Sequence, residues 1–64
     1  MSPQDAADKI MAARQVAVLV RYPAGHYDVL DLSPPMVSVM RDLAPGWVVG
    51  VYPIVEGVPT RQAA

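Results

Sequence analysis

The sequence contains no cysteine and no phenylalanine, has a single histidine, and carries almost no net charge. Without cysteine, neither a disulfide scaffold nor a cysteine-based zinc site can form. The only imidazole, His26, argues against a histidine-based metal site. Five basic and six acidic residues give a net charge of −1, whereas a protein that binds nucleic acid needs a basic excess. We therefore expect no metal, no cofactor and no nucleic-acid partner.

Long hydrophobic runs are also missing. The valine-rich stretches are interrupted by Arg21, Gly50 and Pro53, so none approaches the roughly 20 apolar residues of a membrane-spanning helix. The polar, acidic start of the chain differs from the basic and then apolar pattern of a secretory signal. These features predict a soluble cytoplasmic protein with no membrane partner. Its size and its preference for arginine over lysine suggest a bacterial or phage accessory protein.

The residues that are present indicate a folded domain. With 53% hydrophobic and 17% charged residues, the chain is too apolar for intrinsic disorder. A chain of 64 residues forms one small domain, which buries only about 60% of its unfolded surface. Because disulfides are excluded and metals disfavoured, tight packing or association with another chain must supply stability. We predict a single domain over residues 1–59, followed by a flexible tail over residues 60–64.

Two helices are predicted, and each begins with a Ser-Pro pair that suits a cap and a first helical position. The first covers residues 3–14, and its thin stripe of Ala6, Ile10 and Ala13 suggests a weakly held element. The second runs from residue 34 to residue 43 or 44, where Pro45-Gly46 ends it. We expect it to pack on the sheet through one broad apolar stripe. That stripe consists of Met36, Val39, Met40, Leu43 and Ala44, with Val37 at its margin.

A β-hairpin is the strongest local signal. Between strands at residues 15–22 and 26–32, Pro23 suits the second position of a type I turn, and Gly25 suits the left-handed residue that follows. This turn pairs Arg21 with Tyr27 and divides the side chains between two faces. One face holds Val16, Val18, Val20, Tyr22, Leu30 and Leu32. The other holds Ala17, Leu19, Arg21, Tyr27, Val29 and Asp31.

The last predicted strand covers residues 47–55. Its Gly50 indicates a bulge or a close backbone approach, and Pro53 indicates an edge position. The elements then assemble into an α+β domain, α-β-β-α-β, with a three-stranded mixed sheet in the order 2-1-3. The second helix covers the Val16 and Val18 face. The opposite face is covered either by the first helix or by a second copy of the chain.

Few residues suggest chemistry. His26 and Asp28 resemble a general base with an orienting carboxylate, but their spacing along a strand gives poor hydrogen-bond geometry, and an exposed turn histidine is the simpler interpretation. Asp28, Asp31 and Asp42 suggest a magnesium site, but the hairpin register places the first two on opposite faces. Arg21 either stacks on Tyr27 across the strands or contacts an anion. No glycine-rich phosphate loop occurs, and we assign no catalytic, cofactor or metal residue.

The aromatic and methionine residues have two interpretations each. Tyr22, Tyr27, Trp47 and Tyr52 could stack nucleic-acid bases, but without a basic groove a core or interface role is favoured. The methionines of the second helix could form an adaptable binding surface, although their helical spacing favours core packing.

These observations predict a non-enzymatic interaction or regulatory protein, whose partner is itself or another protein. We expect a homodimer or higher oligomer, formed through the second sheet face or through the edge of the last strand. An alternative is a ligand-binding or simple catalytic domain, with a pocket at a subunit interface near Arg21, His26 and Tyr27. A nucleic-acid-binding regulator is a further alternative, which the charge disfavours. The interface candidates are Ala17, Leu19, Arg21, Tyr27, Val29 and Tyr52.

Overall fold

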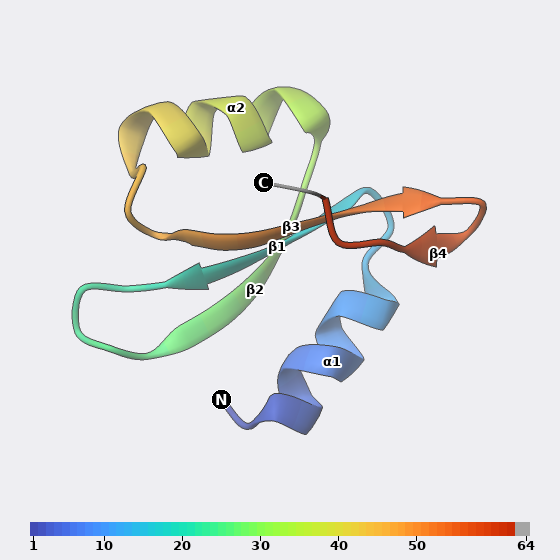
Figure 1. Ribbon diagram of the computed structural model, residues 1–64, viewed down its shortest axis with the longest axis horizontal. Helices are drawn as coiled ribbons and strands as arrows, with labels where there is room; N and C mark the ends of the chain where they lie inside the picture. Colours follow the sequence, from blue (N-terminus) through green and yellow to red (C-terminus); the bar gives the residue numbers. More distant parts are fainter. Residues whose placement is uncertain (63–64) are drawn as a thin grey trace.

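The computed structural model describes residues 1–62, which form two helices and a four-stranded sheet (Figure 1). The chain is α+β, and its strands lie in the order β2-β1-β3-β4 with every neighbouring pair antiparallel. Helix α2 lies on one side of the curled sheet and α1 on the other (Figure 1). The elements are α1 (Pro3–Ala12), β1 (Val16–Arg21), β2 (Tyr27–Leu32), α2 (Pro34–Leu43), β3 (Val48–Val55) and β4 (Val58–Pro59).

The first three strands lie in the predicted order 2-1-3, but the prediction of a three-stranded mixed sheet is wrong in two respects. Because β1 lies between β2 and β3 and is antiparallel to both, no parallel pair forms. A fourth strand, β4, also pairs with β3 through a two-residue turn. Both turn residues, Glu56 and Gly57, have positive φ, at 53° and 78°. This is the backbone of a type I′ hairpin turn, which normally carries asparagine, aspartate or glycine at its first position. Because glutamate is not a usual residue at this position, the sequence does not indicate the turn.

The β1–β2 hairpin has the predicted register, from Arg21 opposite Tyr27 to Val16 opposite Leu32. Gly25 adopts a φ of 99°, as the turn requires, and its N–H donates to the Tyr22 carbonyl at 2.8 Å. The turn closes with the N–H of Tyr22 donating to the His26 carbonyl at 2.9 Å. Because a one-residue slip would turn every side chain to the opposite face, this turn fixes which residues enter the core.

The core lies between α2 and the predicted valine face of the hairpin. Val18 and Val20 are fully buried. The complete cluster consists of Val16, Val18, Val20, Val37 and Val51, with Tyr22, Leu30, Leu32 and Val48 packed at its margin. Helix α2 therefore covers the face expected of it.

The side of α2 that meets the sheet differs from the prediction. Val37 is the buried residue of this helix, whereas Met36, Val39 and Leu43 are exposed by 49%, 42% and 80%. The sequence allows two apolar sides on this helix, because residues 36, 39 and 43 and residues 37, 40 and 44 both recur at helical spacing. Ser33 occupies the N-cap position as expected, but its hydroxyl makes no capping hydrogen bond in the described residues.

Helix α1 lies over the second sheet face. Ser2 caps it by accepting the Asp5 N–H at 3.2 Å, and the helix ends at Ala12, two residues earlier than predicted. Ala17, on the sheet face beneath, is fully buried. No residue of α1 itself is buried, in keeping with its thin apolar stripe. The first helix, one of the two elements expected to cover this face, thus lies over it.

The strand β3 is not an edge strand over its second half. Beyond β4, the Thr60 N–H donates to the Pro53 carbonyl at 2.9 Å, and the Gln62 N–H donates to the Val51 carbonyl at 2.7 Å. Residues 60–62 of the segment predicted to be a flexible tail thus lie along β3, and residues 63–64 lie outside the described part of the chain. Gly50 adjoins the predicted bulge, since Leu19 faces Gly50 while Val20 faces Val48.

Candidate functional site

The predicted interface residues do not form one open apolar surface. Ala17 is covered by α1, Leu19 and Val29 are half-buried, and Arg21 and Tyr27 are exposed. Tyr52 is also half-buried, and its ring would lie only 3.1 Å from a Cβ placed on Gly50. Two hollows remain open between α1 and this face. The first, of about 260 Å³ at the start of the helix, is lined by Met1, Ser2, Pro3, Ala6, Leu19 and Tyr27. The second, of about 230 Å³ near the end of the helix, is lined by Lys9, Ala12, Ala13, Val29 and Asp31.

Asp28 takes part in a structural contact rather than in a pair with His26. Its Oδ1 accepts the Val29 N–H at 2.8 Å and forms an ion pair with the Lys9 ammonium at 3.1 Å. The Val29 amide and the Lys9 ammonium hold the pKa of Asp28 below its ordinary value of 3.8. This carboxylate therefore links α1 to the outer strand of the sheet. In residues 1–62 it makes no hydrogen bond to His26.

Asp31 has a second structural role on the same strand. Its two carboxylate oxygens accept the backbone N–H groups of Arg14 and Gln15, each at 3.0 Å. The sequence analysis considered Asp28, Asp31 and Asp42 as magnesium ligands and disfavoured them. Within the described residues, no three acidic or histidine side chains lie close enough together to hold a metal ion.

His26 instead joins an aromatic cluster at the turn end of the hairpin. Its ring lies 4.6 Å from the Tyr22 ring, tilted by 40°, and Tyr22 meets Trp47 edge-on at 5.3 Å. The Trp47 carbonyl also accepts the Arg21 N–H at 2.8 Å, which fixes the start of β3 beside the end of β1. The sequence analysis missed this cluster, although the turn register places Tyr22 directly opposite His26.

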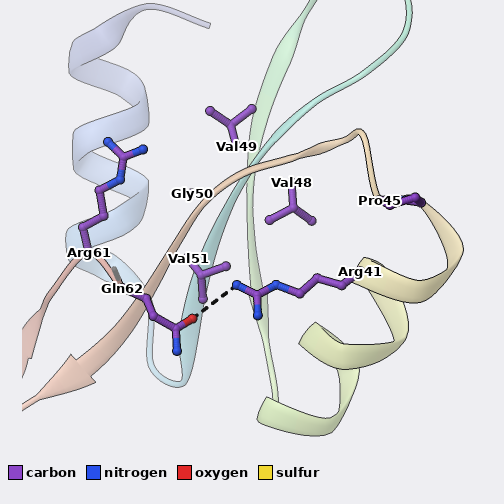
Figure 2. A pocket seen from close by; sticks show the side chains of 8 residues that line it. All are labelled: Arg41, Pro45, Val48, Val49, Gly50, Val51, Arg61 and Gln62. Carbon is purple, nitrogen blue, oxygen red and sulfur yellow. Dashed lines mark hydrogen bonds between the residues drawn. The ribbon is translucent and has the colours of Figure 1, made fainter. Parts of the chain in front are cut away.

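A larger hollow, of about 350 Å³, lies beside β3 near its bulge (Figure 2). Arg41 reaches across it, and its Nη2 donates to the Gln62 Oε1 at 3.3 Å. Figure 2 shows the Arg61 side chain extending in a different direction, so the two guanidinium groups do not converge on one point. The lining residues are Arg41, Pro45, Val48, Val49, Gly50, Val51, Arg61 and Gln62, which include no acid, histidine or hydroxyl group.

A further surface feature is the outward side of α2. Met36, Val39 and Leu43, which we call the α2 stripe, repeat at intervals of three and four residues and so lie along one side of the helix. The stripe contains no charged residue and extends about 10 Å along the helix axis. Beyond Leu43 the chain forms a turn, in which the Trp47 N–H donates a hydrogen bond to the Ala44 carbonyl at 3.0 Å. The Trp47 side chain is 36% exposed.

The sequence analysis assigned the α2 stripe to the core. The signal that could have prevented this error is the second apolar set, Val37, Met40 and Ala44, which has the same spacing. Neither helix of residues 1–62 has the length and hydropathy needed to cross a bilayer. Comparison of the chain with protein-family models, with curated proteins and with solved structures gives no match.

Proposed function

We propose that this chain is a non-enzymatic interaction or regulatory protein that acts through protein–protein contacts made by the α2 stripe. The observation that carries the proposal is the exposure of Met36, Val39 and Leu43 on one side of a helix that already packs on the core through Val37. Adjoining apolar side chains that are exposed along one element are a common feature of protein–protein contact surfaces. Recognition of this type, through a helix face read at three- and four-residue spacing, is common among peptide and protein interfaces.

The positions of the titratable groups favour this function over an enzyme. Asp28 and Asp31 are engaged by backbone amides, and His26 stacks on Tyr22. The alternative pocket near Arg21, His26 and Tyr27 receives little support, because neighbouring strand residues project to opposite faces. Tyr27 lines the hollow beside α1, whereas His26 belongs to the aromatic cluster with Tyr22.

Site-specific photo-cross-linking in the native host tests the proposal. A photoreactive amino acid replaces Leu43 in one variant and Met11 in the other. Met11 is the matched control, because it is a large apolar residue on a helix and is 67% exposed, but it lies outside the α2 stripe. We expect a discrete cross-linked species from position 43 and none from position 11.

The proposal fails if position 43 yields no discrete species, or if both positions yield the same ones. A thermal-shift screen against metabolites and nucleotides addresses the ligand-binding alternative. Ligand present at about 100 times its Kd would add about 2.7 kcal/mol of stability and would raise the melting temperature clearly. An interaction protein should show no such shift.

A further inference from the structure

We propose that the hollow beside β3 binds an extended acidic segment of another protein, which lies along the open half of β3 and places neighbouring carboxylates against Arg41 and Arg61. The inference goes beyond the proposed function, because it concerns a different surface and does not depend on the α2 stripe. Within residues 1–62, this hollow of about 350 Å³ is lined by two arginines and by no acidic side chain.

The outer side of β3 is paired over only part of its length. Val51, opposite Val18, directs its carbonyl outward and accepts the Gln62 N–H at 2.7 Å. Val48 lies opposite Val20, two residues further along β1, so its N–H and carbonyl also point outward. Among the described strands, none pairs with the outer side of β3 at Val48. This half of β3 can therefore take up an added extended segment through main-chain hydrogen bonds.

The two arginines lie on opposite faces of the sheet at this edge. Residues 60–62 are extended, because the Thr60 and Gln62 N–H groups both donate to carbonyls of β3. Successive side chains of an extended segment alternate between the two faces. The Gln62 amide meets Arg41 on the α2 side, so Arg61 projects to the other side, in keeping with the separate directions of the two side chains in Figure 2. A compact anion reaches only one guanidinium group, whereas an extended segment presents neighbouring side chains to both.

Both guanidinium groups can take a carboxylate partner. The ion pair within residues 1–62 joins Lys9 to Asp28, so neither Arg41 nor Arg61 is neutralised there. Arg41 donates to the neutral Gln62 amide oxygen at 3.3 Å. A carboxylate is a stronger acceptor for a guanidinium group than an amide oxygen, and it can bind two of the N–H groups at once. A carboxylate of the partner would therefore replace Gln62 beside Arg41.

The acidic residues of the chain lie away from this edge. Arg41 follows the buried Val37 by about one helical turn and so points toward the sheet, whereas Asp42 is turned a further ~100° around the helix. The other acids lie on α1, in the turn after β3, or on β2, which β1 separates from β3. They are Asp5, Asp8, Asp28, Asp31 and Glu56. The hollow is therefore locally basic although the net charge is −1.

The remaining lining groups define the rest of the partner segment. Most of them are apolar side chains, and Val49 is 43% exposed. They are Pro45, Val48, Val49 and Val51. A segment with two neighbouring acids between apolar, β-branched residues therefore matches both the charge and the apolar surface of the hollow.

Titration with a synthetic peptide, followed by NMR of the isotope-labelled full chain, is the first test. The probe is a blocked peptide with two neighbouring glutamates between valines, and the control peptide has glutamine in place of both glutamates. We expect amide shifts at Val48 and Val49 on saturable binding of the acidic peptide. Its affinity should be about tenfold higher than that of the control peptide, because only the acidic peptide forms charge-assisted bonds.

Substitution of the two arginines tests the contacts separately. Arg41→Gln and Arg61→Gln should each weaken binding of the acidic peptide about fivefold. Arg21→Gln is the matched control, because it makes the same charge change at an exposed arginine that does not line the hollow, and it should leave the affinity unchanged. All three side chains are exposed, so circular dichroism should show the same fold. A peptide with a single glutamate should respond to only one of the two hollow substitutions, since neighbouring side chains reach opposite faces.

Equal affinities for the acidic and glutamine peptides overturn the inference, as does the lack of amide shifts at Val48 and Val49. It is also overturned if Arg21→Gln weakens binding as much as Arg41→Gln. Displacement of the peptide by lower concentrations of inorganic phosphate or of single-stranded DNA than of unlabelled peptide overturns it as well, because the hollow would then prefer a compact anion or a polyanion. The proposed function has a separate test, the photo-cross-link from position 43, whose outcome does not depend on peptide binding.

Discussion

The two aspartates of β2, Asp28 and Asp31, make structural contacts and do not form a catalytic or metal-binding group. Asp28 faces Lys9 and its own neighbouring amide, and Asp31 binds the two amides that follow α1. An ionised carboxylate has acceptor positions only, so each one that binds backbone amides has fewer left for a metal ion. The alternation of the strand separates the two carboxylates further. Two acids that resemble metal ligands in the sequence thus become two separate links between the sheet and α1.

The first prediction concerns the pH dependence contributed by Asp28. The Val29 amide and the Lys9 ammonium lower its pKa in the folded state, so its contribution to stability is present above the unfolded value of 3.8 and is lost as pH falls through the folded pKa. Asp28→Asn should therefore be less stable than the unaltered chain at about pH 6 and nearly equal to it at about pH 2. Urea unfolding at the two pH values measures the difference in unfolding free energy between the variant and the unaltered chain. An equal difference at both pH values would contradict the prediction.

The second prediction concerns the hairpin turn. Gly25 has a φ of 99°, which side-chain-bearing residues rarely adopt, although nothing lies within 4 Å of a Cβ placed there. Gly25→Val should therefore cost about 1–2 kcal/mol through backbone strain alone. Gly46→Val is the matched control, because its Cβ also meets nothing within 4 Å and its φ lies outside the strained range. Equal melting temperatures for the two variants would show that the turn imposes no strain.

At the scale of elements, α1 and α2 hold to the sheet in different ways. Helix α2 inserts Val37 into the core, whereas α1 buries no residue fully and depends on polar links at its C-terminal end. Those links are the Lys9–Asp28 ion pair and the two amide bonds to Asp31. Exposed ion pairs contribute little, so the amide bonds should matter more. Helix α1 is then the element most able to separate from the sheet.

The third prediction tests this weak attachment. Asp31→Ala leaves the exposed Arg14 and Gln15 amides to water, and we expect a loss of about 0.5–1.5 kcal/mol, concentrated in α1. Hydrogen exchange should become faster over residues 3–12 and change less over β1 and β3. Asp31→Asn retains one acceptor oxygen, so its stability should lie between that of the unaltered chain and that of Asp31→Ala. Uniform acceleration across the chain would show that α1 does not open separately.

The same elements show what the sequence can predict. The hairpin follows from local chemistry, because proline and glycine fix the turn and the turn fixes the register. The orientation of α2 about its own axis does not follow from local chemistry, because both of its apolar sides fit a 3.6-residue period. Tertiary packing determines that Val37, and not Met36, faces the sheet. The strand β4 was missed because Glu56 adopts a left-handed conformation that its residue type does not favour. The sequence analysis considered a binding surface at the methionines of α2 but favoured core packing, because the helical spacing does not show which side of α2 faces the sheet.

At the scale of the whole molecule, the chain is compact but has a small core. Its Cα radius of gyration is 11.1 Å, close to the value of about 11 Å expected for a domain of this length. Yet the buried apolar residues among residues 1–62 are five valines and an alanine, with no aromatic side chain among them. Exposed large apolar side chains lie on both helices, at Trp47 and on the strands. A core this small gives limited stability, and a partner that buried the exposed apolar side chains would add to it. For this reason we place the function on the outward side of α2.

The distribution of charge over the whole molecule leads to the last prediction. Arg21 lies on β1 and Arg41 on α2, whereas Arg14 and Arg61 lie outside the helices and strands, and Lys9 is paired with Asp28. Tight nucleic-acid binding draws on several cationic contacts along one surface, each of which releases counterions. Without such a surface, the protein should not shift labelled DNA or RNA in a gel at submicromolar concentration and physiological salt. A shift that weakens steeply as salt rises would contradict this and would favour a nucleic-acid-binding regulator. Arg41→Gln and Arg61→Gln, on either side of the hollow beside β3, would then show whether that hollow is the binding surface.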